Sequence, residues 1–215
     1  MTTLFNSSKK CGCCGKQTDV LAVGSTNAFG SCDLDLRPPE MERSAMFHFM
    51  QFCEHCGYAA WDLEEPIPMS NELKDILSEK ISSRDTIKVF ERAAKIAVLR
   101  GDKIENIDSL YLIAAWAADD QNDDAVAALL RRKILANHQG EEKLSPENLL
   151  QLIDVARRCG ERETAAQLLQ RFDECKTEPL LKRIAAFQKK LIQNGDTACY
   201  TVEDVETGGR GKCEP

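Results

Sequence analysis

The spacing of apolar residues changes along the chain at Pro66. Before this proline, Val20–Val23 and Met46–Phe52 are the two strand candidates, because each is a short, largely apolar run next to turn-forming residues. Beyond it, apolar residues recur every three or four positions, the spacing of a helix that buries one face. The pattern predicts an α+β protein, with a small strand-containing domain over 1–66 and a helical domain over 67–194.

Residues that favour helix ends mark the boundaries of the predicted helices. Ser70 and Ser145 can cap a helix N-terminus, and Pro146 suits the first helical position. Gly101 and Gly160 can adopt the left-handed conformation that ends a helix. The expected helices cover residues 70–81, 84–100, 107–118, 122–139, 145–160, 165–172 and 178–194. The remaining segment, 195–215, has little periodicity and is expected to be a disordered tail.

The turn around Gly160 resembles that of a tetratricopeptide hairpin, with Ala156 before the glycine and Ala165 on the next helix. An earlier hairpin places Ala125 forty residues before Ala165, whereas the usual period is about 34 residues. We therefore expect an irregular, tetratricopeptide-like array of helical hairpins, a type of fold that commonly binds a protein or peptide on its concave face. A plain helical bundle fits the same pattern.

Two cysteine pairs of the same form, each followed by glycine, occur in the first quarter of the chain. They are Cys11 with Cys14 and Cys53 with Cys56. A C-x-x-C turn places two sulfurs on one side, and two such turns complete a tetrahedron. The pattern predicts one structural metal ion bound by these four residues, zinc in the first place and iron as the alternative. Reduced cysteines or disulfides would leave the doubled pattern unexplained.

A metal ion also has an energetic role in a domain of this size. The segment that holds the two cysteine pairs is too short to bury a large core. Ordering each residue costs about 1–2 kcal/mol, whereas a structural zinc returns about 10–16 kcal/mol of apparent binding free energy. We therefore expect a zinc ribbon, in which short antiparallel strands meet the metal turns, and we expect it to unfold without metal.

The other cysteines keep a second function class open. Cys13 adjoins a predicted ligand, and Cys32 lies between the two pairs, but neither belongs to a two-residue gap of the same form. A redox or electron-transfer protein would hold iron at the four-cysteine site or cycle reactive thiols. The sequence does not decide whether the remaining cysteines have redox roles: Cys13, Cys32, Cys159, Cys175, Cys199 and Cys213.

The charge and hydropathy of the chain indicate which classes of binding partner it favours. The formal net charge is −7, and five basic but nine acidic side chains precede Pro66. A ribbon that binds nucleic acid is usually basic, so nucleic acid is the less favoured alternative. The chain has no apolar run long enough to cross a bilayer and no apolar signal segment near Met1, which predicts a cytoplasmic protein without a membrane partner. The pattern does not indicate an oligomeric state.

Several stretches of the chain carry a family resemblance: Cys11–Gly15, Ser25–Ser31, Asp33–Glu40 and Cys53–Ala60, and more weakly Ala114–Trp116 and Arg157–Gly160. They are similar to the bacterial domain of unknown function 2225 family. The resemblance implies paired zinc-ribbon turns followed by a tetratricopeptide-like helical region. It implies no activity, because the family's function is unassigned.

Charged residues gather in the segment between the cysteine pairs, and they are the candidates for a further role. They are Asp33, Asp35, Arg37, Glu40 and Arg43. No nucleophile and base accompany them, so an ion pair of Asp33 or Asp35 with Arg37 is expected to lock the loop rather than catalyse. The sequence thus favours a non-enzymatic, zinc-stabilised adaptor that binds a protein partner through its helical domain and this charged loop.

Overall fold

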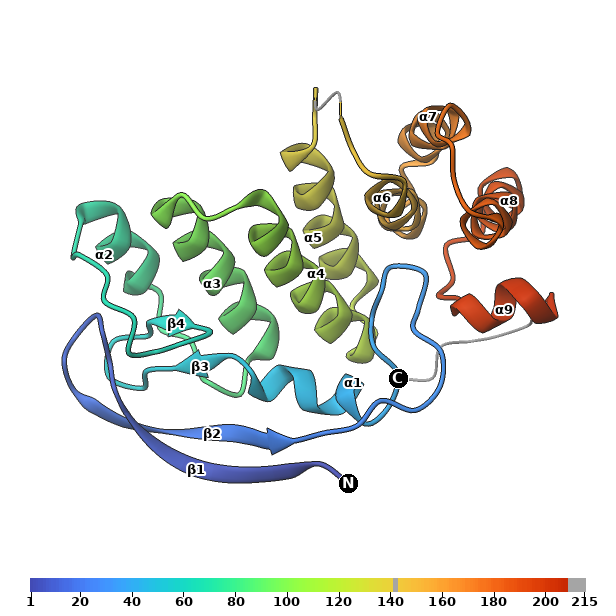
Figure 1. The fold of residues 1–215 in the computed structure, drawn as a ribbon. Helices are drawn as coiled ribbons and strands as arrows, with labels where there is room; N and C mark the ends of the chain where they lie inside the picture. Colours follow the sequence, from blue (N-terminus) through green and yellow to red (C-terminus); the bar gives the residue numbers. More distant parts are fainter. Residues whose placement is uncertain (141–142, 209–215) are drawn as a thin grey trace. The chain divides into compact units, whose positions relative to one another are not determined.

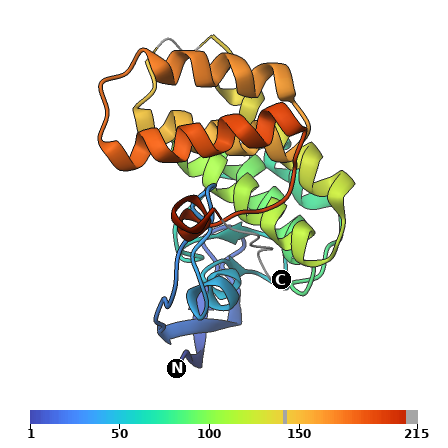
Figure 2. The same cartoon turned by 90° about the vertical axis from the view of Figure 1, so that its right-hand side faces the viewer.

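The structure is a computed structural model that describes residues 1–140 and 143–208. Within it the chain forms two compact units. Unit 1 comprises Met1–Ala28 and Glu40–Ala118, and unit 2 comprises Phe29–Pro39 and the chain from Asp119 onward. The segment between the two cysteine pairs therefore leaves unit 1, contributes to unit 2 and returns. Figure 1 shows the elements in order, and Figure 2 shows them turned by 90°.

Each cysteine pair of unit 1 lies at the turn of an antiparallel hairpin. β1 (Thr3–Lys10) pairs with β2 (Gln17–Ser25), so that Lys10 opposes Gln17 across the first turn. β3 (Gln51–Phe52) pairs with β4 (Ala59–Ala60) across the second. Hairpins bring the two cysteines of each pair to a strand end, where the chain reverses.

The prediction of a strand at Met46–Phe52 is wrong except for its last two residues, which form β3. The chain instead forms α1 (Glu42–Ala45) and then a 3₁₀ turn, η1 (Met46–His48). Met46 and Met50 are both buried, and a spacing of four residues also places side chains on one face of a helix. β1 was missing from the prediction because its side chains are mostly exposed and show no apolar alternation.

The helices of unit 1 are α2 (Asn71–Ser78), α3 (Thr86–Arg100) and α4 (Ile104–Asp120). The Ser70 side chain accepts a hydrogen bond from the N–H of Leu73, and Gly101 ends α3 in the left-handed conformation, as expected. The core of the unit joins helix residues such as Leu73 and Ile96 to the cysteine turns. The last two residues of α4 belong to unit 2.

Unit 2 is helical, and α6 is its centre. Its helices are α5 (Asp124–Asn137), α6 (Pro146–Arg158), α7 (Arg162–Asp173), α8 (Pro179–Asn194) and α9 (Val202–Thr207). α6 contacts α5, α7 and α8. Ser145 accepts from the N–H of Asn148 at its start, and Gly160 turns the chain into α7 with a φ of 79°. The sheets and helices together agree with the α+β class.

Two expectations differ from the structure. The division expected at residue 66 separates α2, α3 and most of α4 from the cysteine turns, whereas all of them belong to unit 1, in which α3 contacts α2 and β4. The tail expected to be disordered contains α9, whose capping box joins Thr201 and Asp204. Residues 209–215 of that tail lie outside the described part of the chain. Within residues 1–140 and 143–208, no helix combines the length and apolar character needed to cross a bilayer.

Candidate metal centre

The four cysteines predicted as ligands lie together in unit 1. Their sulfur atoms are all within 4.8 Å of one another. Cys11 Sγ lies 3.8 Å from Cys56 Sγ, and Cys14 Sγ lies 3.7 Å from Cys53 Sγ. A tetrahedron with Zn–S bonds of about 2.3 Å has edges of about 3.8 Å. The distances are too long for disulfides, whose sulfurs are about 2.05 Å apart, and all four thiols are free. This group can hold a metal ion.

The two cysteine turns have the same backbone geometry. The N–H of Gly15 donates to the carbonyl of Cys11, and the N–H of Gly57 donates to the carbonyl of Cys53, both at 2.8 Å. Both glycines have a positive φ, 74° and 77°, a region in which glycine carries no steric penalty. Each C-x-x-C-G motif therefore folds as the same tight turn, with its N–H groups directed around the sulfurs.

Gly12, inside the first turn, is set by close backbone packing. Its N–H donates to the carbonyl of Leu63 at 2.8 Å. A Cβ at this position would lie 2.2 Å from the carbonyl oxygen of Glu65, which is far inside van der Waals contact. The segment Asp62–Glu65 thus lies directly over the first cysteine turn, and only glycine leaves room for it.

Substituting Gly12 with alanine tests this packing. We expect Gly12→Ala to displace the first turn and to destabilise unit 1 by about 1–3 kcal/mol or more, since the obstructing atom belongs to the backbone. Metal affinity should fall with it. The matched control is Gly15→Asn, because a Cβ there meets nothing within 4 Å and asparagine tolerates a positive φ. Thermal unfolding and metal titration measure both; equal effects of the two variants would contradict the packing argument.

A buried arginine supports the second turn. Arg92 of α3 is 4% exposed, and its guanidinium donates to the carbonyl of Gly57 at 3.2 Å and to the carbonyl of Glu79. Burial lowers the pKa of Arg92, against the opposing effect of Glu79 and Cys56. Four thiolates around a divalent ion carry a net charge of −2, so a guanidinium at this place also offsets part of that charge.

The pKa values of the thiols indicate that the cluster needs a positive ion before all four cysteines can lose their protons. Burial raises the pKa of Cys11 to about 11 and raises the pKa of Cys56 further. Burial also acts on Cys14, but the N–H of Lys16 and the neighbouring thiols outweigh it, so the pKa of Cys14 is lowered. Without a positive ion, Cys11 and Cys56 keep their protons at neutral pH. A divalent cation supplies the charge that four thiolates need.

Metal affinity should therefore depend steeply on pH. Because thiols with raised pKa hold protons at neutral pH, the metal must displace them, and proton competition grows as the pH falls. We expect the affinity to drop about tenfold per pH unit for each displaced proton, so that displacing the protons of Cys11 and Cys56 lowers it about ten-thousandfold from pH 7 to pH 5. Competition with a chromophoric chelator measures it. An affinity that is constant over this range would contradict thiolate ligation.

Two other cysteines of the sequence, Cys13 in unit 1 and Cys32 in unit 2, are poorly suited to reaction. Cys13 stands next to a ligand but outside the four-sulfur group. Burial raises the pKa of Cys13 and of Cys32, which reduces the thiolate fraction that reacts. His55, within the second turn, donates from Nε2 to the carbonyl of Gln17 at 2.9 Å and is not part of the cluster either.

The five charged candidates of the loop do not form one site. Glu40 and Arg43 lie in unit 1, where Glu40 accepts from the hydroxyl of Ser44 at 2.8 Å and Arg43 is buried. Asp33, Asp35 and Arg37 lie in unit 2 and are buried there. The structure therefore separates the loop residues into two groups.

The side-chain partner expected for Arg37 is corrected. Arg37 binds Asp120 with both ends of its guanidinium, at 2.9 and 2.6 Å. Its own backbone carbonyl accepts from the N–H of Asp33 at 2.9 Å, which closes the turn. Asp120 is the last residue of α4 and belongs to unit 2, so the ion pair joins the loop to the end of α4 and not to another residue of the loop.

Asp35 is the centre of a buried ion network. Its carboxylate lies 2.7 Å from Arg158 Nη1 and 3.6 Å from Arg131 Nη2, and both arginines also contact Asp119. The Asp35 side chain is 0% exposed. Burial alone lowers the pKa of Arg158, but the charges of Asp35 and Asp119 outweigh it and raise it above its ordinary value. The network fixes the loop on α5 and α6.

Sequence reasoning did not find the helix partners of this loop. Arg131 and Arg158 lie within the predicted helices, but no local pattern connects them with the loop. One sequence signal points to a partner for Arg131. It lies four positions after Ala127 and three positions before Ile134, both buried, so it stands on the apolar face of its helix. A charge on a buried face requires a partner.

Comparison with protein-family models, with curated proteins and with solved structures finds no match for this chain.

Proposed function

We propose that the four-cysteine site holds one structural zinc ion and that the protein is a non-enzymatic adaptor that binds a protein partner through its helices. The observation that carries the proposal is the closed set of four thiols, with distances that suit tetrahedral zinc. When the protein supplies all four ligands, no position is left for substrate, and the ion stabilises the fold instead of reacting. Cys11, Cys14, Cys53 and Cys56 would be the ligands.

The helical hairpin of α6 and α7 supports the second half of the proposal. The two helices are in contact and are joined by the tight turn at Gly160, as in a tetratricopeptide-like unit. Hairpin arrays leave a polar face between neighbouring helices that serves to bind proteins or peptides. The resemblance to the family of unknown function 2225 agrees with this arrangement.

The charged loop was expected to bind a partner, but in this proposal it has a structural role. Asp35 and Arg37 are almost fully buried and are held by ion pairs to helix residues, so they are not exposed to a partner. Their role in the proposed adaptor is to hold the helices, and partner binding falls to the exposed helix faces of unit 2.

Iron with a redox function is the second candidate, because the same four-thiolate set suits iron. The two candidates differ in colour: a zinc protein is colourless, whereas a four-thiolate iron site absorbs visible light. If the purified protein contains iron and its visible absorption changes on reduction, the electron-transfer function is supported and the adaptor proposal is wrong.

Capture of the tagged full-length protein from its native cell tests the adaptor function. We expect a protein partner that co-purifies with the wild type, is identified by mass spectrometry and binds the purified chain directly. Capture with the Cys53→Ser variant shows whether binding needs the metal site. A wild type that retains no protein, or whose retained proteins do not bind it when purified, would overturn the adaptor proposal.

A further inference from the structure

Unit 1 has a cavity that is lined by residues of β2, η1, β3 and α3. Figure 1 shows β2 next to β3, with which it is in contact. The volume of the cavity is about 230 Å³, which is below the range of pockets for drug-sized ligands and suits a single long side chain. Its apolar lining includes the buried side chains of Val20, Met50, Phe52 and Val89.

The cavity lies at the free edge of β2. Asp19, Val20 and Leu21 all line it. Successive side chains of a strand point to opposite faces, so a cavity that touches three consecutive residues lies at the edge of the strand. β1 pairs with the other edge of β2 and contributes no residue to the lining. The cavity is therefore on the side of β2 that faces away from β1.

The backbone of β2 offers hydrogen-bonding groups at this edge. The N–H of Cys11 donates to the carbonyl of Lys16, which sets the alternation of the ladder between β1 and β2. Asp19 and Leu21 then direct their N–H and C=O groups away from β1. Within residues 1–140 and 143–208, these outward groups have no hydrogen-bond partner. An extended peptide can pair with such an edge as an added strand.

The charged lining of the cavity is acidic. Asp19 and Glu54 line it, whereas no lysine or arginine does. Neither carboxylate forms a hydrogen bond or an ion pair with any residue that the structure describes. His48 is the remaining titratable side chain of the lining, and even a protonated His48 leaves the lining with a net negative charge. The cavity therefore attracts a cationic group.

The cations nearest to the lining in sequence leave these carboxylates unpaired. Arg84 and Lys88 are exposed and lie outside the lining. Lys88 pairs with Glu79, and Arg84 forms no ion pair with a described residue.

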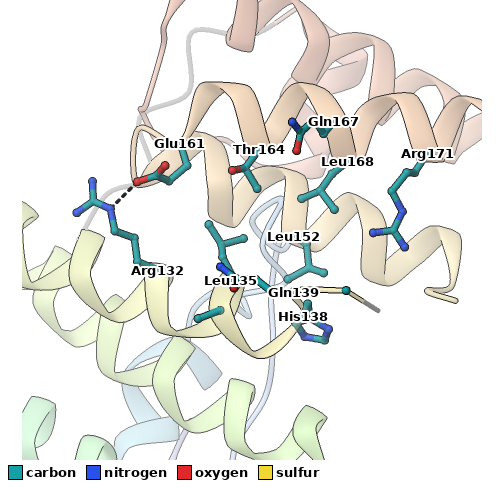
Figure 3. A pocket seen from close by; sticks show the side chains of 12 residues that line it. Arg132, Leu135, His138, Gln139, Leu152, Glu161, Thr164, Gln167, Leu168 and Arg171 are labelled. Carbon is teal, nitrogen blue, oxygen red and sulfur yellow. Dashed lines mark hydrogen bonds and ion pairs between the residues drawn. The ribbon is translucent and has the colours of Figure 1, made fainter. Parts of the chain in front are cut away.

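A groove in unit 2 differs from this cavity in the pairing of its charges. It lies between α5 and α7, and Figure 3 shows Arg132 directed at Glu161 across it. The Nε of Arg132 donates to Glu161 at 2.7 Å. Because these two charges offset each other, the lining of that groove does not indicate the sign of a ligand's charge.

We infer that the cavity beside β2 binds an extended segment of a partner protein, with an arginine or lysine side chain of that segment against Asp19 and Glu54. The methylene groups of the basic side chain pack on the buried apolar residues of the lining, and its cation pairs with the two carboxylates. The backbone of the segment pairs with the free edge of β2. The site goes beyond the proposed adaptor function, because it lies in unit 1 and does not use the helix faces of unit 2.

Fluorescence anisotropy with the full-length protein tests the inference. The probe is a labelled pentapeptide of sequence Ser-Thr-Arg-Thr-Ser with blocked ends, and its match is Ser-Thr-Gln-Thr-Ser. We expect the arginine peptide to bind at least about fivefold more tightly than the glutamine peptide, and its binding to weaken as salt is added. Equal binding of the two peptides, or no binding of either up to about 1 mM, would overturn the inference.

A competitor without a peptide strand tests the role of the β2 edge. N-acetylarginine amide carries the same cation but cannot form an added strand. We expect it to displace the labelled peptide at least about tenfold less well than the unlabelled pentapeptide does, because it lacks most of the backbone hydrogen bonds. If it competes equally well, the site binds small cations and the assignment to an extended partner segment is wrong.

Two variants of unit 1 locate the binding site. Asp19→Asn removes a charge from the lining, whereas Asp75→Asn removes the same charge from an exposed position of α2 outside it. We expect the first to weaken binding of the arginine peptide about threefold to fivefold and the second to change it less than about twofold. Asp19 is chosen because Glu54 adjoins Cys53, and metal content should stay unchanged in both variants. An equal effect of the two substitutions would overturn the assignment to this cavity.

Discussion

Cys53→Ser should abolish metal binding and unfold the cysteine-containing part of unit 1. Cys53 is fully buried, and its sulfur lies 3.7 Å from that of Cys14 across the two turns. Serine offers a poor ligand for zinc, so the apparent binding free energy of about 10–16 kcal/mol that folds such a site is largely lost. We expect metal content to fall from one ion per chain to near zero, and amides of β3 and β4 to lose their hydrogen-exchange protection.

Cys13→Ser is the matched control for this prediction. Cys13 belongs to the same turn but lies outside the four-sulfur group, so its loss should leave metal content and protection unchanged. Metal analysis and hydrogen exchange on both variants decide the matter. The assignment of the four ligands would be contradicted if Cys13→Ser released the metal, or if Cys53→Ser kept it.

Asp35→Asn should destabilise unit 2 by about 3–5 kcal/mol, the range observed when one partner of a buried ion pair is removed. Asparagine has the same shape but no charge, and it leaves Arg131 and Arg158, 2% and 7% exposed, with Asp119 as the remaining carboxylate of the network. Denaturant-dependent hydrogen exchange of α5 and α6 measures the free energy of opening of this unit separately from that of unit 1.

An exposed ion pair in the same unit provides the control. Arg183 and Glu206 lie 3.2 Å apart with side chains 56% and 60% exposed, and Arg183→Gln should change stability by no more than about 1 kcal/mol. If Asp35→Asn left unit 2 intact and instead abolished the binding of a captured partner, the loop would be a binding element and the locking role would be wrong.

The features that the sequence predicted well are local ones. The cysteine turns were recognisable because each C-x-x-C-G motif carries its ligands and its turn residue within five positions. The helices with capping residues, such as Ser70 and Ser145, were placed close to their observed starts. The capping box between Thr201 and Asp204 is equally local, and it was available as a signal for α9.

The features that the sequence did not predict depend on distant partners. Arg37 binds Asp120 and Asp35 binds Arg158, and no local pattern connects residues so far apart in the chain. The loop between the cysteine pairs was therefore expected to close on itself, whereas its Phe29–Pro39 part belongs to unit 2. β1 was missed for a related reason: its stability comes from pairing with β2 rather than from an apolar face of its own.

We propose that four cysteines hold one zinc ion and that the fold of unit 1 depends on this ion. Native mass spectrometry of the full-length protein, with elemental analysis of the same sample, tests it most directly. We expect one zinc per chain in a colourless protein, and we expect the cysteine turns to unfold when a chelator removes the ion. A chain that carries iron and absorbs visible light, or one that contains no metal while β3 and β4 remain protected from exchange, would contradict it.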